Sequence, residues 1–259
     1  MNSDPSPAEL YARRIRHLVE DYDFGGRVLN LVADLWGPNA IFNAWREFRD
    51  WDRGKDEETP LKLGSDSPFA KLFISWLAHS WRLVEDRDGE IDPDLVGCAP
   101  TEVFLDRHPG LSSLLYRFLE TCTYSPFSFY EVLHCKRGRS LHFRDLIIAR
   151  EHEIFDETAA QILKPGSMVY ARVVEMDGLA LLEALAPITF SGAHIQPIID
   201  CRNALLDGAP PPIEIGLARQ LLVDREPELR RAFWDLVSRS DLRPALDPCL
   251  GVGIKPRLH

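Results

Sequence analysis

The sequence predicts an α+β protein in which a small, five-stranded, barrel-like β module lies between two helical regions. Residues 125–190 combine period-two alternation of apolar side chains with tight-turn signals, which is typical of short strands. Both flanking regions carry apolar residues at helical spacing instead. The 259 residues are 45% hydrophobic, which is enough for a substantial core. We therefore expect an acidic all-helical domain over 1–124, the β module over 125–190, and C-terminal helices with a tail over 191–259.

The first region opens with a helix-start signal. Ser6 suits the N-cap, Pro7 the first helical position, and Glu9 the third position of a capping box. The glycine pair 25–26 is expected to end this helix, because glycine adopts the left-handed conformation of a helix end at little cost. A second helix should then run to the Gly-Pro break at residues 37–38.

Aromatic and apolar residues mark the rest of the helical region. Residues 42–51 contain four large aromatics three positions apart, namely Phe42, Trp45, Phe48 and Trp51. They either pack in the core, as large aromatics commonly do, or form a binding surface for a ligand. Further helices are expected from Ser67 to Val84, over 101–107 and over 111–122.

Residues 125–190 should form five short strands joined by well-defined turns. Residues 164–166 (Lys-Pro-Gly) suit a type II turn, and residues 177–178 (Asp-Gly) are a strong hairpin signal. Five strands in so short a stretch favour a small barrel, which leaves no open edges. Along the first strand, one face should carry Phe127, Phe129, Leu133 and Cys135. The expected strands are 127–135, 141–144, 153–155, 168–176 and 179–185.

The chain beyond Pro187 is expected to be irregular at first. The proline run 210–212 cannot lie inside a helix. Apolar spacing then predicts two helices, over 216–223 and 226–237. Prolines and glycines dominate the remainder, which indicates a loop or a tail.

Composition argues against several classes of protein. The formal net charge is −10, and residues 1–125 carry most of it, with 14 Lys and Arg against 22 Asp and Glu. Such a chain repels nucleic-acid phosphate, so nucleic-acid binding would need a local basic patch. Five scattered cysteines without a C-x-x-C pair argue against a zinc ribbon and a disulfide framework. No apolar run is long enough for a membrane span and no signal sequence opens the chain, so we expect a cytoplasmic protein without a cofactor.

Three segments of the β module carry a family resemblance. They are Ser125–Val132 (SPFSFYEV), Gly138–Leu146 (GRSLHFRDL) and Leu163–Val174 (LKPGSMVYARVV). In this order they resemble the middle region of a group of bacterial proteins that often end in a SEC-C motif, a zinc motif named for the SecA C-terminus. The resemblance covers about a quarter of the chain and implies a helical region before a small β module, but no activity. The cysteine-rich SEC-C ending is absent here, so the resemblance implies neither zinc binding nor a SecA-like partner contact.

The best candidate for a binding site is the basic turn of the β module. Lys136, Arg137, Arg139 and Arg144 lie close together, with Tyr130 as a neighbouring aromatic residue. Small barrels with a basic, aromatic face commonly bind single-stranded nucleic acid by phosphate contact and base stacking. The same residues could contact a protein partner, or form a basic hairpin tip in water, because several carboxylates follow directly in the chain.

Three histidines of the β module suggest a second, metal-dependent possibility. If the strands pair, His134 and His142 could be cross-strand neighbours, and His152 follows shortly after them. Two histidines with Glu151 or Asp145 could form a metal site, as in a hydrolase. The alternative is that His142 is simply the solvent-facing residue of an alternating strand. No G-x-S-x-G elbow and no complete P-loop occurs, so we assign no catalytic residue and no metal ligand.

The absence of a catalytic motif favours a non-enzymatic binding or adaptor protein with a protein partner. Single-stranded nucleic-acid binding through the basic face is the second hypothesis, and an unrecognised metal-dependent hydrolase is the third. The sequence does not define the partner or the oligomeric state.

Overall fold

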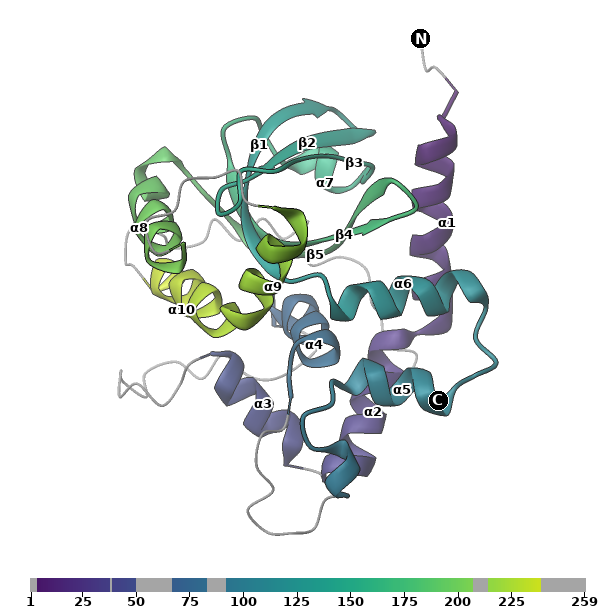
Figure 1. Ribbon diagram of the computed structural model, residues 1–259. Coiled ribbons are helices and arrows are strands. Elements are labelled where there is room, and N and C mark those ends of the chain that lie inside the picture. The colour runs from purple at the N-terminus through teal and green to yellow at the C-terminus, as the bar shows by residue number, and fades with distance from the viewer. Residues whose placement is uncertain (1–3, 38, 50–66, 83–91, 207–213, 239–259) are drawn as a thin grey trace.

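The computed structural model describes residues 4–37, 39–49, 67–82, 92–206 and 214–238. It confirms the α+β architecture, with a closed five-stranded barrel and helices packed around it (Figure 1). The helical region contains α1 (Pro7–Tyr22), α2 (Phe24–Trp36), α3 (Ala40–Phe48), α4 (Ala70–His79), the 3-10 turn η2 (Pro93–Leu95), α5 (Pro100–Arg107) and α6 (Ser113–Thr123). The β module contains β1 (Phe127–Lys136), β2 (Ser140–Asp145), β3 (Glu151–Ile154), α7 (Ala159–Ile162), β4 (Met168–Met176) and β5 (Leu179–Phe190). The C-terminal region contains η3 (Gly192–His194), α8 (Ile195–Leu205), α9 (Ile215–Asp224) and α10 (Glu226–Val237).

The boundary between α1 and α2 differs from the prediction. The capping box is confirmed, since the Glu9 amide donates to Ser6 Oγ at 3.3 Å and the Ser6 amide donates to the Glu9 carboxylate. The predicted glycine stop is wrong, because α1 already ends at Tyr22 and the next residue, Asp23, takes the left-handed conformation at φ 50°. Aspartate tolerates that conformation better than most residues. Gly25 and Gly26 lie in the first turn of α2, and a Cβ at Gly26 would come within 2.6 Å of the Asp23 carboxylate.

The aromatic segment 42–51 belongs mainly to the core. Trp45 and Phe48 are 3% and 1% exposed, and Trp45 packs edge-on against Phe73 of α4 with ring centroids 4.9 Å apart. Phe42 is 54% exposed, and Trp51 lies outside the described residues. Core packing is therefore the role of the two described aromatics that point inward.

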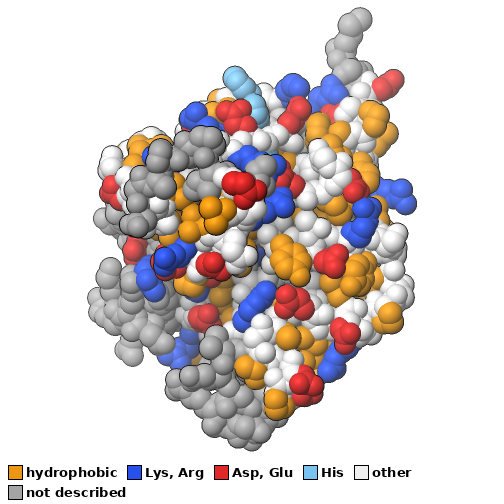
Figure 2. Space-filling model, viewed as in Figure 1, with side chains coloured by type: hydrophobic (Ala, Val, Ile, Leu, Met, Phe, Trp, Pro, Cys, Tyr) orange, Lys and Arg blue, Asp and Glu red, His pale blue; other side chains and the backbone are white. Residues whose placement is uncertain are grey.

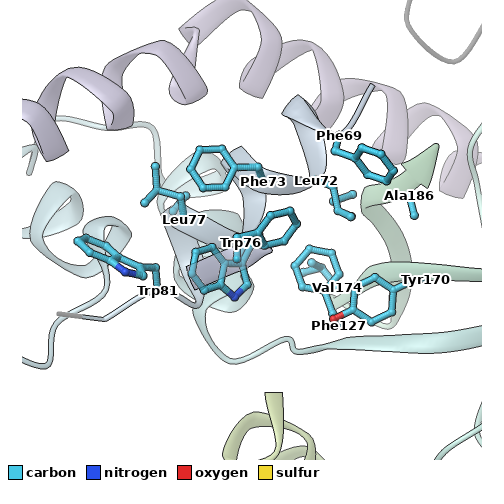
Figure 3. Packing of buried hydrophobic residues seen from close by; sticks show 14 of the residues in the cluster. Phe69, Leu72, Phe73, Trp76, Leu77, Trp81, Phe127, Tyr170, Val174 and Ala186 are labelled. Atoms are coloured by element: carbon cyan, nitrogen blue, oxygen red, sulfur yellow. The ribbon is translucent and has the colours of Figure 1, made fainter. Parts of the chain in front are cut away.

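Helix α4 lies at the centre of the molecule. Seven of its ten residues are buried. It begins after Ser67, whose hydroxyl accepts a hydrogen bond from the Phe69 amide at 3.3 Å. Figure 3 shows Phe73 and Trp76 of α4 in the same cluster as Phe127 and Tyr170 of the barrel. The core is thus continuous from the helical region into the β module.

The barrel closes in the strand order β1-β2-β3-β5-β4. Neighbouring strands are antiparallel except β3 and β5, which are parallel and meet at the single pair Ile154 and Ala180. Strand β1 takes part in two ladders, with its first half on β4 and its second half on β2. The predicted hairpin turn is confirmed, since Asp177 and Gly178 have φ values of 52° and 77°.

Three local features of the β module and its flank were not predicted. A bulge between Val132 and His134 shifts the register of β1. The prediction of one face is therefore wrong, because Phe127 and Phe129 pack under the helices while Cys135 packs against the barrel interior. Strand β5 continues past Pro187 to residue 190, and α8 follows where irregular chain was expected. The short α7 supplies two alanines to the interior core.

The two faces of the barrel strands have different partners. Inward-facing side chains, such as Val132 and Phe143, form the interior cluster. Outward-facing side chains of β1, β4 and β5 pack under α10, α6 and α4, and Phe233 of α10 stacks on Tyr170 with centroids 4.5 Å apart. This outer cluster draws side chains from all three predicted regions. In the described part of the chain, no helix has both the length and the apolar character needed to cross a membrane.

Candidate binding face on the barrel

The outer face of β2 and β3 is exposed, in contrast to the outer face of β4 and β5. Along β2, Leu141 and Phe143 are buried inside the barrel, whereas His142 and Arg144 point outward. The same alternation holds in β3. We define the β2–β3 face by its outward-pointing residues and their neighbours on β1, namely Glu131, His134, Lys136, His142, Arg144, Glu151 and Glu153.

Charges on the β2–β3 face are paired across the strands. Lys136 Nζ lies 3.2 Å from Glu153 Oε1, and His142 Nε2 lies 3.2 Å from Glu151 Oε2. Arg144 forms an ion pair with Glu131. Figure 2 shows basic and acidic side chains interspersed on the visible surface, without a large patch of one sign. The face therefore offers balanced charge and little excess positive potential.

The predicted basic residues have distinct environments. Arg137 is exposed at the tip of the β1–β2 turn, next to the paired Lys136. Arg139 instead binds Glu9 of α1, with Nε and Nη2 at 2.7 and 2.9 Å from the two carboxylate oxygens. Hydrogen bonds from Arg139, and then from the Ser6 amide, lower the pKa of Glu9 to about 2. Arg139 is thus engaged by a helix from the first region.

Tyr130 is located inside the barrel. Its side chain is 4% exposed and lies against Phe143 with ring centroids 5.7 Å apart. Burial, followed by the charges of Asp145 and Glu175, raises the pKa of Tyr130 well above its ordinary value. The structure therefore groups Lys136, Arg137 and Arg144 at the surface but does not bring Tyr130 to them.

The three histidines of the β module do not converge. His134 and His142 are cross-strand partners, as predicted, with ring centroids 6.0 Å apart. His152 faces the other way, is 8% exposed and lies edge-on to Tyr130. Among the described residues, no group of three or more His, Cys, Asp and Glu is arranged to hold a metal ion.

A charge cluster at the seam between β3 and β5 was not predicted from the sequence. Glu175 of β4 meets Arg150 Nη1 at 2.7 Å and His152 Nδ1 at 3.2 Å, and it also pairs with Arg219 of α9. Burial alone would raise the pKa of Glu175, but His152 and the two arginines outweigh it and keep this pKa below its ordinary value. These contacts reinforce the seam, which has a single parallel bridge. The spacing of these residues along the sequence does not indicate that they lie together.

A second polar cluster, between α4 and the barrel, contains residue types that enzymes use. Ser75 donates a hydrogen bond to Glu183, and His79 Nε2 lies 3.8 Å from the same carboxylate. The Ser75 hydroxyl bonds to the acid and not to the histidine, so the order of a catalytic triad is not present. Ser75, His79 and Arg172 are 4%, 2% and 0% exposed, so a substrate has no access to them. The cluster joins α4 to β4 and β5.

No protein family, curated protein or solved structure matches this chain. The barrel is closed by five strands and has the short helix α7 between β3 and β4, and small barrels of this kind serve unrelated functions in different proteins. The architecture therefore does not assign a ligand, so the chemistry of the exposed β2–β3 face has to decide.

Proposed function

We propose that the protein is a cytoplasmic, non-enzymatic binding or adaptor protein that contacts another protein through the β2–β3 face. One observation carries the proposal. The outer faces of β4 and β5 are buried under helices, whereas the outer face of β2 and β3 carries polar residues open to solvent. A regular, rigid surface of this kind suits recognition, because its side chains are held by the barrel beneath them.

The charge pattern of the face favours a protein over a nucleic acid. Nucleic-acid binding gains its affinity from cations that replace the counterions of phosphate. Here Lys136 and Arg144 each face a carboxylate, and the whole chain carries a net charge of −10. A protein partner can match alternating charges, which mainly confer specificity and orientation.

Affinity isolation from the native host tests this proposal; the sequence resemblance directs that search to bacteria. The decisive bait exchanges one cross-strand pair, Arg144→Glu with Glu131→Arg, which keeps an ion pair and the net charge but reverses the pattern. The matched control exchanges the exposed pair Arg225 and Glu228 at the start of α10 in the same way. We expect wild type and control to recover a stoichiometric partner. The face variant should recover about tenfold less of it, or even less. Failure to recover such a partner, or its retention by the face variant, would contradict the proposal.

Single-stranded nucleic acid is a second candidate ligand. The closed five-stranded barrel with its exposed β2–β3 face is the observation that favours it, because five-stranded barrels of the OB-fold type bind oligonucleotides on the face of strands 2 and 3. Arg137 projects from the β1–β2 turn, and the His134 and His142 rings lie side by side on the same face. A cation beside exposed rings can serve backbone and base contact together.

Binding of labelled single-stranded RNA and DNA of about 20 nucleotides tests the second candidate, because that length spans at least one site on a barrel of this type. We expect retention at low salt, a steep loss with added salt, and weaker binding by Arg137→Ala with Arg144→Ala. Arg14→Ala with Arg225→Ala is the charge-matched control. Absence of binding at low salt, or an equal effect of both double variants, would remove this candidate.

A further inference from the structure

Helix α1 lies against one end of the barrel, where it contacts three connections of the β module (Figure 1). Glu9 binds Arg139 of the β1–β2 turn at 2.7 Å. Arg16 Nη2 lies 2.9 Å from Asp156 in the β3–α7 connection. Tyr11 donates a hydrogen bond to Asp177 of the β4–β5 turn. One helix therefore covers the two turns that flank the β2–β3 face.

The charges on the two sides are complementary in order. Glu9, Arg13 and Arg16 follow one another at spacings of four and three residues, so they share one side of α1. Arg13 pairs with Glu157, next to the contact of Arg16 with the neighbouring Asp156. An acid followed by two bases on the helix thus meets a base followed by two acids on the barrel. Such a pattern orients a docked helix and suppresses other registers.

Apolar burial holds α1 much less firmly than it holds α4. Only three of the sixteen residues of α1 are buried, and Ile15 is the single large apolar side chain among them. The Arg13–Glu157 pair is open to water on both sides, at 42% and 40% exposure. In the other two pairs the arginine is partly exposed, whereas the Glu9 and Asp156 carboxylates are 8% and 12% exposed. Salt screens pairs of this kind.

The chain around Asp23 provides a pivot for α1. Asp23 interrupts the helical conformation between α1 and α2, and no side chain caps the start of α2. Phe24 directly after it is 5% exposed and packs on Phe104 and His79, with ring centroids 5.3 and 5.6 Å away. Asp177 keeps a second anchor, Arg117 of α6, at 2.9 and 3.0 Å. Phe24 and the Asp177 turn would therefore keep these contacts if α1 swung away from the barrel.

We infer that α1 is a charge-held cover, which pivots at Asp23 and regulates access to the turns that flank the β2–β3 face. Opening would separate Arg139 from Glu9, and one side of the Asp177 carboxylate from Tyr11. The inference goes beyond the proposed function and does not depend on it, because opening can be measured without a partner.

Hydrogen exchange of the full chain, followed by mass spectrometry, tests the cover. Arg13→Glu with Arg16→Glu should accelerate exchange in α1 and in the β1–β2 turn by about tenfold or more, while α4 and β4 keep their wild-type rates. Raising salt from about 0.1 M to about 1 M should act in the same direction on wild type, since the screening length falls from about 10 Å to about 3 Å. Arg14→Glu, on the exposed side of α1, is the matched control and should exchange as wild type does.

A charge reversal separates docking by attraction from general damage. Arg13→Glu alone should open α1, and adding Glu157→Arg should restore slow exchange, because the pair re-forms with opposite sign. Wild-type α1 exchange in Arg13→Glu with Arg16→Glu would overturn the inference. Equal acceleration in α4 and β4, or failure of Glu157→Arg to restore protection, would overturn it as well.

Discussion

At the scale of single residues, the buried His79 couples the stability of the fold to pH. Its ring is stacked on Phe24 and lies 2.8 Å from the Thr101 hydroxyl. Burial, and then the charge of Arg172, lower the pKa of His79 well below its ordinary value. The folded protein therefore binds this proton less readily than the unfolded chain. The stability contribution is complete above a pH of about 6.5 and is lost as the pH falls below it.

We expect His79→Gln to flatten the dependence of the unfolding free energy on pH. Between about pH 7 and pH 5, wild type should lose up to about 1.4 kcal/mol per pH unit more than the variant, the effect of one proton. Urea denaturation at a series of pH values measures this difference. His17→Gln is the control, because the His17 side chain is 72% exposed. A wild-type slope in His79→Gln, or the same change in both variants, would contradict the assignment.

Glu183 acts on the pH dependence in the opposite sense. Burial raises the pKa of this carboxyl, against the effects of Arg172 and Ser75, so the folded protein binds its proton more readily than the unfolded chain does. Its contribution to stability therefore grows as the pH falls toward its unfolded pKa and declines as the pH rises through its folded pKa. Comparison of wild type with His79→Gln isolates the histidine because Glu183 is present in both.

Residue types are readable in the sequence, but their partners are not. The basic turn stands out in the sequence, and Lys136, Arg137 and Arg144 do lie on one exposed face. Nothing local connects Arg139 with Glu9, because the pair forms only when α1 docks on the barrel. Tyr130 reads as a stacking residue by type, yet β1 turns it into the interior. Whether a side chain can reach a partner depends on long-range docking and on the side of the strand that it occupies. Neither can be read from the residue type alone.

At the scale of secondary-structure elements, α4 has the largest buried fraction among the helices of the described chain. Its side chains pack on α3 and α5 within the helical region and on β5 of the barrel. Trp76 also donates its indole N–H to Glu226 of α10 at 2.8 Å. Truncation in α4 should therefore affect the whole fold.

Leu77→Ala should lower the unfolding free energy by about 3 kcal/mol, because Leu77 is 0% exposed and its removal leaves a cavity. Leu10→Ala is the same substitution at a residue of α1 that is 52% exposed, and should cost no more than about 0.5 kcal/mol. Chemical denaturation of both variants provides the comparison. Similar losses in the two variants would show that α4 is not the centre of the core.

The elements with strong local signals were predictable. The Asp-Gly turn at 177–178 and the alternating strand β2 were identified because turn chemistry and period-two burial are local properties. Helix α7 was missed because four residues carry too little periodicity to detect. Helix α8 was not predicted, although Pro197 is its third residue, in the first turn, where a proline is tolerated. The bulge in β1 has no sequence signal of its own and is fixed by the partner strands.

At the scale of the whole molecule, the β module depends on helices from both flanking regions. Phe127, Phe129 and Phe190 are 1%, 0% and 1% exposed, and all three belong to the cluster shared with the helices. An isolated module would present these side chains to water, at a cost of about 25 cal/mol for each Å² of apolar surface.

We therefore expect a fragment of residues 125–190 to remain unfolded or to aggregate. Its amide spectrum in two-dimensional NMR should show little chemical-shift dispersion, whereas the full chain should show the dispersion of a folded α+β protein. The full chain should also unfold in one cooperative transition by circular dichroism and by tryptophan fluorescence. A well-dispersed spectrum from the isolated module would show that the barrel is an independent domain.

The stacking of Phe233 in α10 on Tyr170 in β4 has a consequence for biosynthesis. The ribosome releases β1, β4 and β5 before it releases the helix that shields them, because α10 follows them in the chain. During that interval the nascent protein exposes an aromatic strip, which is the type of surface that chaperones bind and that promotes aggregation. Translation that stops before α10 would thus produce a chain marked for degradation, and not a shorter working protein.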